Sequence, residues 1–137
     1  MWPLLALLSS MAAASARAEV VVVGNLSMSA DALSQEEVKE FYLGKLQRMG
    51  DGVAVEVIDL PDGNDTRDEF YLKAMGKTSN QIKAYWAKRV FTGKGAPLRT
   101  LPHDLAVMKW VAAKVGRIGY VDANVADDSV KVLLRLP

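Results

Sequence analysis

The sequence predicts one α/β domain in which helices cover a central sheet. Three observations support this prediction. Short runs of β-branched residues alternate with amphipathic helical segments, most of the helical segments begin with a capping signal, and the chain is long enough for one hydrophobic core but not for two. Because strands alternate with capped helices, the helices are expected to lie against the faces of the sheet.

The first 18 residues, MWPLLALLSSMAAASARA, predict a secretory signal peptide. Their apolar core is roughly ten residues long, shorter than the about 20 needed to span a membrane. Ala16 and Ala18 fit the small-x-small cleavage rule. No Lys or Arg precedes the apolar core, so a start further upstream or a retained anchor stays an alternative. We expect cleavage after Ala18, one mature domain at 19–137 and a periplasmic location.

Charge and cysteine content narrow the class of protein. The chain has 17 Lys and Arg against 16 Asp and Glu, and Arg17 belongs to the predicted leader, so the mature domain is formally neutral. A neutral domain has no overall field that attracts nucleic acid or a membrane surface, and we expect no nucleic-acid partner. The chain has no cysteine, which excludes disulfides, thiolate metal ligands and a thiol nucleophile.

Four segments predict strands. The first, EVVVVGN, is β-branched without interruption up to a Gly-Asn pair, as expected of a strand buried on both faces. The others are VAVEVIDL, RIGYVDA and SVKVLLRL. In order, the predicted strands cover residues 19–25, 53–60, 117–123 and 129–136.

Four segments predict helices, and three of these carry the capping-box spacing of Ser or Thr followed three residues later by Glu or Gln. These pairs are Ser34 with Glu37, Thr66 with Glu69, and Thr78 with Gln81. Each segment also carries an apolar stripe at helical spacing. The stripes are Val38, Phe41 and Tyr42; Phe70, Tyr71, Ala74 and Met75; Ile82, Tyr85, Trp86 and Val90; and Leu105, Met108, Ala112 and Val115.

The stretch DLPDGNDTRDEF, residues 59–70, joins the second predicted strand to the second predicted helix. Ligands of α/β sheets usually bind at the carboxyl ends of strands, and helix N-termini favour anions. Here the turn is acidic, with Arg67 as its only base. One hypothesis is an anion held by the amides of residues 65–68 and by Arg67. The other is that Asp65 caps its own helix. Calcium is a weaker alternative, since Ile58 and Leu60 interrupt the alternating acids of an EF-hand loop.

Three segments resemble motifs of the phosphate-binding proteins that serve ABC transporters, in the type II periplasmic binding protein family. They are LSQEEVKEFYLGK, FTGKG and GRIGYVDA, and the match extends from Val20 to Leu133. Typical members have two α/β lobes that close on phosphate, whereas this chain is long enough for one. The resemblance therefore implies a single three-layer lobe, with a central mixed sheet flanked by helices. It also implies a membrane transporter or sensor as partner, or self-association that completes the cleft.

The resemblance also implies a set of ligand-binding residues. In the family, an Arg precedes a Ser-Gly-Thr-Arg turn that holds phosphate at a helix N-terminus. On this sequence the turn falls on Asn64, Asp65, Thr66 and Arg67, with Asn64 in place of Ser and Asp65 in place of Gly. The position of the upstream Arg falls near Asp59.

A basic loop at residues 92–102 adds one more candidate. Lys94 and Arg99 could lend positive charge to a neighbouring anion, and we include Lys94 among the expected ligand-binding residues. The alternative is an ordinary solvated loop. Gly95 follows Lys94 where a nucleotide-binding P-loop needs Ser or Thr, so we do not expect a nucleotide.

His103 is the only histidine, and it stands at a predicted helix start. A single histidine cannot build a multi-histidine metal site, and no G-x-S-x-G motif accompanies it. We therefore expect His103 to cap its helix or to lie at the surface. The sequence predicts no catalytic residues, no metal, no cofactor and no enzymatic activity.

Taken with the resemblance, these features favour an exported solute-binding-like protein that recognises phosphate or a similar small oxyanion at a helix N-terminus. The alternative is a ligand-free interaction or regulatory module that kept one binding-protein lobe. The two hypotheses differ in what the turn at residues 64–67 does.

Overall fold

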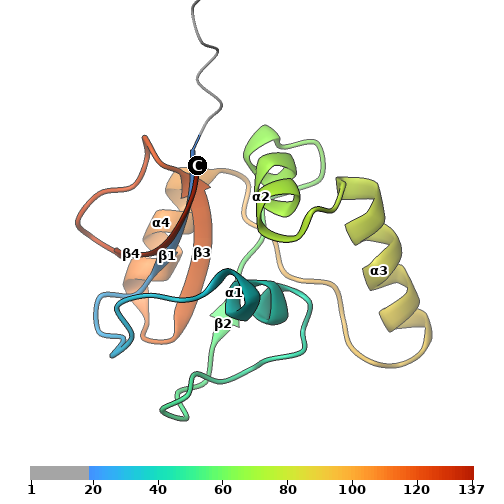
Figure 1. Ribbon diagram of the computed structural model, residues 1–137, viewed down its shortest axis with the longest axis horizontal. Helices are drawn as coiled ribbons and strands as arrows, with labels where there is room; N and C mark the ends of the chain where they lie inside the picture. The colour runs from blue at the N-terminus through green and yellow to red at the C-terminus, as the bar shows by residue number, and fades with distance from the viewer. Residues whose placement is uncertain (1–18) are drawn as a thin grey trace, which may run out of the picture.

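The computed structural model describes residues 19–137, so the predicted leader lies outside the described residues (Figure 1). No helix in the described part is long and apolar enough to cross a membrane. The elements are β1 (Val20–Gly24), α1 (Gln35–Tyr42), β2 (Glu56–Val57), α2 (Asp65–Met75), α3 (Ser79–Phe91), α4 (Asp104–Ala113), β3 (Arg117–Asp122) and β4 (Lys131–Leu136).

The strands form a mixed sheet in the order β2-β3-β1-β4. β1 is antiparallel to both β3 and β4, whereas β2 is parallel to β3. The predicted mixed sheet is therefore confirmed. β1 lies between β3 and β4 in Figure 1, and all of its residues are buried, as its uninterrupted valines predict.

The second predicted strand, 53–60, is much shorter in the structure. Only Glu56–Val57 pairs with β3 as a ladder. Ala54 and Asp59 each form an isolated bridge, with Arg48 and Thr100 respectively. β2 is an edge strand, and the Ile58 N–H still donates to the Ile118 carbonyl of β3 at 3.2 Å before the chain reaches the turn that opens α2.

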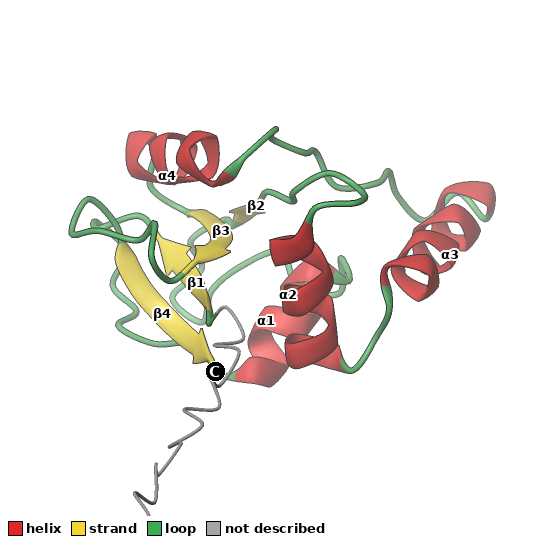
Figure 2. Cartoon of the chain, turned by 90° about the horizontal axis from the view of Figure 1, so that it is seen from above, coloured by secondary structure: helices red, strands yellow, loops and turns green. Residues whose placement is uncertain are grey.

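The helices form layers on the two faces of the sheet (Figure 2). α4 packs on one face, while α1 and α2 pack on the other. This arrangement confirms an α/β lobe with a helix layer on each side. α3 departs from the expectation that helices cover the sheet, since it packs beside α2 and stands away from the strands (Figures 1 and 2).

An aromatic cluster joins the helix layer of α1 and α2 to the sheet. The rings of Phe70 from α2 and Tyr120 from β3 are stacked, with centroids 3.9 Å apart and planes 3° from parallel. Tyr42 from α1 meets both rings edge-on, at 4.7 Å and 5.6 Å. Such pairs add to the stabilisation from buried area. All three side chains are buried, so the predicted stripes on α1 and α2 do face the core.

Two of the three predicted capping boxes are confirmed, those of Ser34 with Glu37 and Thr78 with Gln81. The third, Thr66 with Glu69, is wrong. α2 begins at Asp65, and Asn64 is its N-cap. The tight turn before the helix explains this difference. The Asn64 N–H donates to the Pro61 carbonyl at 3.1 Å, and this turn delivers an extended Asn64 directly to the helix start.

The buried face of α4 also differs from the prediction. Of the predicted stripe, Met108 is buried, but Leu105 and Val115 are exposed. Val107 and Val111 are buried instead. The hydrophobic positions of this helix run almost around its whole circumference, so the pattern alone does not select a face.

The face of α4 is selected by a glycine in β3. A Cβ at Gly119 would lie 2.5 Å from Cγ1 of Val107 and 3.2 Å from Cγ2 of Val111, so this glycine lets the helix approach the strand. Gly116, three residues earlier, has φ +86°, and a Cβ there would lie 2.3 Å from the Ala54 carbonyl oxygen. The glycine spacing of GRIGYV thus matches two close approaches, one by α4 and one by the segment before β2.

Candidate functional site

The turn that opens α2 uses its own side chain as a cap. Oδ1 of Asn64 accepts from the Arg67 N–H at 3.0 Å, and the Asn64 carbonyl accepts from the Asp68 N–H at 3.1 Å. Asp65 is the first helical residue and is exposed, while Thr66 is half-buried. The hypothesis that Asp65 caps its own helix is therefore wrong, because Asn64 already holds that position.

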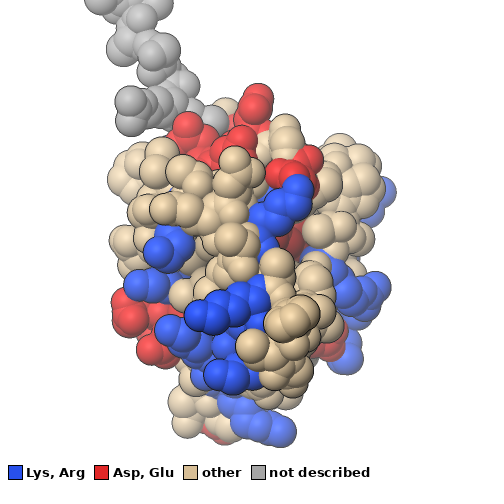
Figure 3. Space-filling model, turned by 90° about the vertical axis from the view of Figure 1, so that its right-hand side faces the viewer, with Lys and Arg blue, Asp and Glu red and all other residues tan. Residues whose placement is uncertain are grey.

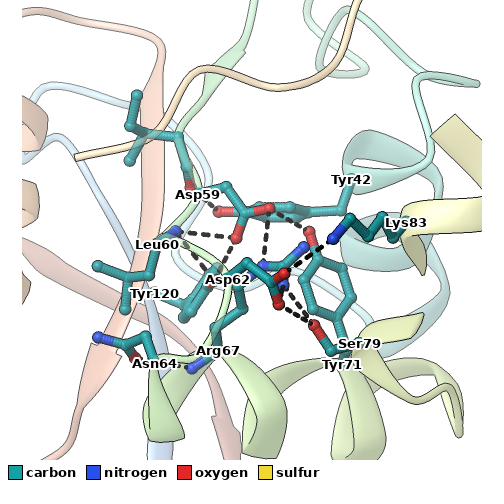
Figure 4. Close-up of polar contacts among 11 residues, drawn as sticks. Tyr42, Asp59, Leu60, Asp62, Asn64, Arg67, Tyr71, Ser79, Lys83 and Tyr120 are labelled. Carbon is teal, nitrogen blue, oxygen red and sulfur yellow. Dashed lines mark hydrogen bonds and ion pairs between the residues drawn. The ribbon is translucent and has the colours of Figure 1, made fainter. Parts of the chain in front are cut away.

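Behind the turn lies a buried carboxylate, Asp59, two residues after the end of β2 (Figure 4). One of its oxygens, Oδ1, accepts from the Leu60 N–H at 2.9 Å and from the hydroxyl of Tyr120. The other, Oδ2, accepts from the hydroxyl of Tyr71 at 2.6 Å. A buried charge is costly unless it is bonded and balanced. Here two phenols and an amide solvate the carboxylate.

Arg67 supplies the balancing charge. Its Nε lies 3.6 Å from Oδ2 of Asp59, and its guanidinium lies over the ring of Tyr71, 5.2 Å from the centroid. Its Nη1 donates to Oδ1 of Asp62 at 3.3 Å and also to the hydroxyl of Ser79. Arg67 is itself buried. The one base of the turn is therefore engaged by two carboxylates of the same chain.

Asp62 forms the outer part of this network. It accepts from Nζ of Lys83 on α3 at 3.2 Å and from the hydroxyl of Ser79 at 3.1 Å. These hydrogen bonds, that from Lys83 first, hold the pKa of Asp62 below its ordinary value. Asp62 thus links the turn before α2 to α3, through a hydrogen bond from Ser79 and an ion pair with Lys83 (Figure 4).

The phenols around Asp59 stay neutral over a wide pH range. Burial raises the pKa of Tyr71 and Tyr120 well above the ordinary value of 10.0, and the charge of Asp59 raises it further. The hydroxyl of Tyr42 donates to the Ile58 carbonyl at 2.9 Å. The pKa of Tyr42 is raised by the same two causes, burial first and the charge of Asp59 second. A neutral phenol can donate a hydrogen bond to the carboxylate, whereas a phenolate would repel it.

Two cavities lie beside this network, and Trp86 and Leu98 line both of them. The first, of about 360 Å³, is bordered by Asp59, Arg67 and Lys83, whose charges are already paired. The second, of about 370 Å³, is lined by Lys94 together with other basic and apolar side chains.

The structure brings only part of the predicted ligand-binding set together. Asn64 is the N-cap of α2, and Asp65, Thr66 and Arg67 form its first turn. Of these, Arg67 points inward to Asp59 (Figure 4). Lys94 lies in the loop after α3 and lines the second cavity rather than the turn.

Sequence reasoning missed that Tyr71 and Tyr120 are partners of Asp59. Tyr71 was expected only as part of an apolar stripe, and the strand that holds Tyr120 only as a strand. A signal was present, because Asp59 is a single acid between Ile58 and Leu60 in a buried segment. A buried acid requires donors, and tyrosines on neighbouring elements are among the side chains that supply them without adding a charge.

His103 caps α4, and capping is one of the two roles predicted for it. Its Nδ1 accepts from the Ala106 N–H at 3.2 Å. Within residues 19–137, no group of three or more His, Cys, Asp or Glu side chains is arranged to hold a metal ion.

No protein-family model and no curated protein matches this sequence. Solved structures do match. An ABC-type phosphate transport receptor from Vibrio cholerae shares 16% identity at a TM-score of 0.66. A putative phosphate ABC transporter substrate-binding protein with bound phosphate from Clostridium perfringens shares 18% identity at a TM-score of 0.68. PstS from Borrelia burgdorferi shares 11% identity at a TM-score of 0.64. The fold is similar to that of about half of a phosphate-transport receptor.

The likeness extends over 85% of this chain but over only 46%, 45% and 47% of those three chains. The chain therefore spans about half the length of the receptors it matches, which fits a single lobe. At these identities the likeness establishes the fold alone. What the site binds depends on the side chains of this chain.

Proposed function

We propose that the protein is an exported, single-lobe relative of solute-binding proteins that works as an interaction module and does not hold free phosphate at α2. The observation that carries this proposal is the buried carboxylate of Asp59. It stands near the position where the resemblance places a phosphate-binding Arg, and it reverses the charge there. Arg67, the remaining base, already faces Asp59 at 3.6 Å and Asp62 at 3.3 Å.

The charges at the surface of the turn support the same proposal. A phosphate that approached the start of α2 would meet the exposed acids Asp62, Asp65 and Asp68. Like charges disfavour such an approach, and Arg67 cannot compensate without leaving the buried carboxylate of Asp59 without its counter-charge. A partner protein, in contrast, could bind the lobe without placing an anion at this turn.

The resemblance supports a class of partner, as do two structural neighbours described as an ABC-type phosphate transport receptor and a phosphate ABC transporter substrate-binding protein. We propose a membrane transporter or sensor, or a second copy of the chain that completes a cleft. The module binds rather than catalyses.

Recognition of a small oxyanion at α2 is the second candidate, and one observation favours it. The N–H groups of Asp65 and Thr66 have no acceptor among the described residues, and free amides at a helix N-terminus attract anions. One structural neighbour is described with bound phosphate. Because this lobe supplies only one wall of such a site, we expect the lobe to bind phosphate no more tightly than roughly the high micromolar range, about −5 kcal/mol.

Calorimetric titration of the purified protein with phosphate and sulfate separates the two candidates. If the protein is an interaction module, neither the wild type nor Asp65→Gly should bind phosphate or sulfate. The oxyanion candidate predicts weak wild-type binding that Asp65→Gly tightens, since the change removes a repelling charge. Glu36→Gln is the matched control, because it removes an exposed acid from the first turn of α1 instead. Nanomolar binding of phosphate by a demonstrated monomer would contradict both.

Export has its own test. The protein recovered from outside the cytoplasm should begin at Glu19 on N-terminal sequencing, because Ala18 ends the predicted leader. Recovery of the intact chain, beginning at Met1, in the cytosol would contradict this part of the proposal.

A further inference from the structure

The larger of the two cavities, about 370 Å³ in volume, lies away from the α2 turn. It opens between the end of α3, the β2 edge and the loop that joins α3 to α4. Much of its wall is apolar, including Trp86, Trp110 and Leu98. Its volume falls within the range of about 300–1,000 Å³ that is usual for small-molecule sites. The cavity is therefore large enough for a small organic molecule.

The same wall carries an excess of positive charge. Arg89, Lys94 and Arg99 line the cavity, and Glu56 is its one acidic lining residue. Glu56 is already paired, with Nζ of Lys114 3.0 Å from its Oε1. Figure 3, which faces α3, shows Lys and Arg side chains gathered over this side of the molecule. The charge of the cavity is thus complementary to an anion.

Two buried donors in the wall lack an acceptor in the described part of the chain. They are Nε1 of Trp86, a side chain that is 9% exposed, and Nε of Arg89. The guanidinium of Arg89 lies over the rings of Tyr85 and Trp86, at 5.6 Å and 5.7 Å from the centroids. A buried donor without an acceptor is destabilising, so a small shift of either side chain that brought its donor to a ligand acceptor would stabilise the site.

We propose that this cavity binds a small organic anion, in which a flat apolar body is joined to one acidic group. The body packs against Trp86 and Trp110, and the acidic group accepts hydrogen bonds from Arg89 and the neighbouring Lys94 and Arg99. Neither half of such a ligand is sufficient, because the site offers both an apolar wall and unpaired donors. This site is separate from the α2 turn, and it does not depend on how that turn functions.

The test uses three probes on the purified chain. Anilinonaphthalene sulfonate has a flat apolar body and an acidic group, N-phenylnaphthylamine has a similar body without the charge, and inorganic phosphate has the charge without the body. We expect the sulfonate to bind with a rise in its fluorescence, the amine to bind more weakly, and phosphate at equal concentration not to displace the sulfonate.

The variants locate the site. Arg89→Gln should weaken the sulfonate about tenfold, which is the effect of losing one charge-assisted hydrogen bond. Trp86→Phe should also weaken it, because the ring is kept while the indole N–H is removed. Lys88→Gln is the matched control, since Lys88 is exposed on the same helix but does not line the cavity. Unchanged near-UV circular dichroism should show that each variant is folded.

Several outcomes would overturn the proposal. One is no binding of the sulfonate by the folded wild type. Another is an equal loss in Lys88→Gln and Arg89→Gln, which would indicate attraction by the whole basic face. Tight binding of the neutral amine in every variant, or displacement of the sulfonate by phosphate, would show that the site does not require an organic anion.

Discussion

The carboxylate of Asp59 and the guanidinium of Arg67 form a buried ion pair, with Oδ2 and Nε 3.6 Å apart. Asp59 follows β2 and Arg67 belongs to the first turn of α2, so the pair joins the sheet to the helix that covers it. Arg67 is the counter-charge of Asp59, and the Tyr71 and Tyr120 hydroxyls are additional donors to the carboxylate. The stability of the lobe should therefore be sensitive to the loss of one partner.

Arg67→Ala should lower the free energy of unfolding by about 3–5 kcal/mol, because it leaves the carboxylate of Asp59 buried without a counter-charge. Urea denaturation measures this change. Lys83→Ala is the control, since it removes an exposed partner of Asp62 and should cost less than about 1 kcal/mol. The double change Asp59→Leu with Arg67→Met should cost less than Arg67→Ala alone. If Arg67→Ala and Lys83→Ala lowered the free energy of unfolding equally, the buried pair would be contradicted.

The buried tyrosines predict the behaviour at alkaline pH. The pKa values of Tyr42, Tyr71 and Tyr120 are raised above 10.0 in the folded protein. Their contribution to stability is therefore fully present below about pH 10 and is lost as the pH rises toward the folded-state pKa values. Phenolate absorbance from these residues should rise together with unfolding. Full titration of every tyrosine near pH 10 in a still folded protein would contradict the arrangement.

Trp86 and Phe91 stand on the same helix with opposite exposure, 9% and 93%. Trp86→Ala should cost about 3–5 kcal/mol, because it removes a buried ring that holds α3 against the lobe. Phe91→Ala should change the free energy of unfolding by less than about 0.5 kcal/mol. Thermal or urea unfolding of both variants provides the comparison. A loss below about 1 kcal/mol for Trp86→Ala would mean that α3 is not packed as described.

The cap of α2 can be assigned by a pair of adjacent substitutions. Asn64→Ala should destabilise the protein by about 1 kcal/mol, because the Arg67 N–H loses its acceptor. Asp65→Ala removes only an exposed acid near the positive end of the helix, and we expect a smaller loss of about 0.3–1 kcal/mol. If Asp65→Ala proved the more costly change, the cap would have been placed on the wrong residue.

The parts of the fold that could be predicted are those fixed by residues close together in the sequence. β1 is an unbroken run of valines, and the capping boxes at Ser34 and Thr78 each involve residues three apart. The buried face of α4 could not be predicted, since it depends on the space that Gly119 leaves in a strand further along the chain.

The candidate site could also be predicted only in part. The resemblance led to the residues at the start of α2, but it could not show that Arg67 turns inward. That orientation depends on Asp59, Tyr71 and Tyr120, which three separate elements bring together. Lys94, Trp86 and Arg89 line one cavity. The sequence could not predict this for Lys94, because the loop after α3 has no periodic pattern from which its path could be inferred.

The position of β1 has a consequence for the order in which the chain can fold. Both hydrogen-bonding edges of β1 are occupied by the two strands that are synthesised last, β3 and β4. A ribosome that has made three quarters of the chain has therefore not yet supplied either neighbour of the central strand. Closing such long loops before their contacts form slows folding. The sheet around β1 can therefore close only after both β3 and β4 have left the ribosome.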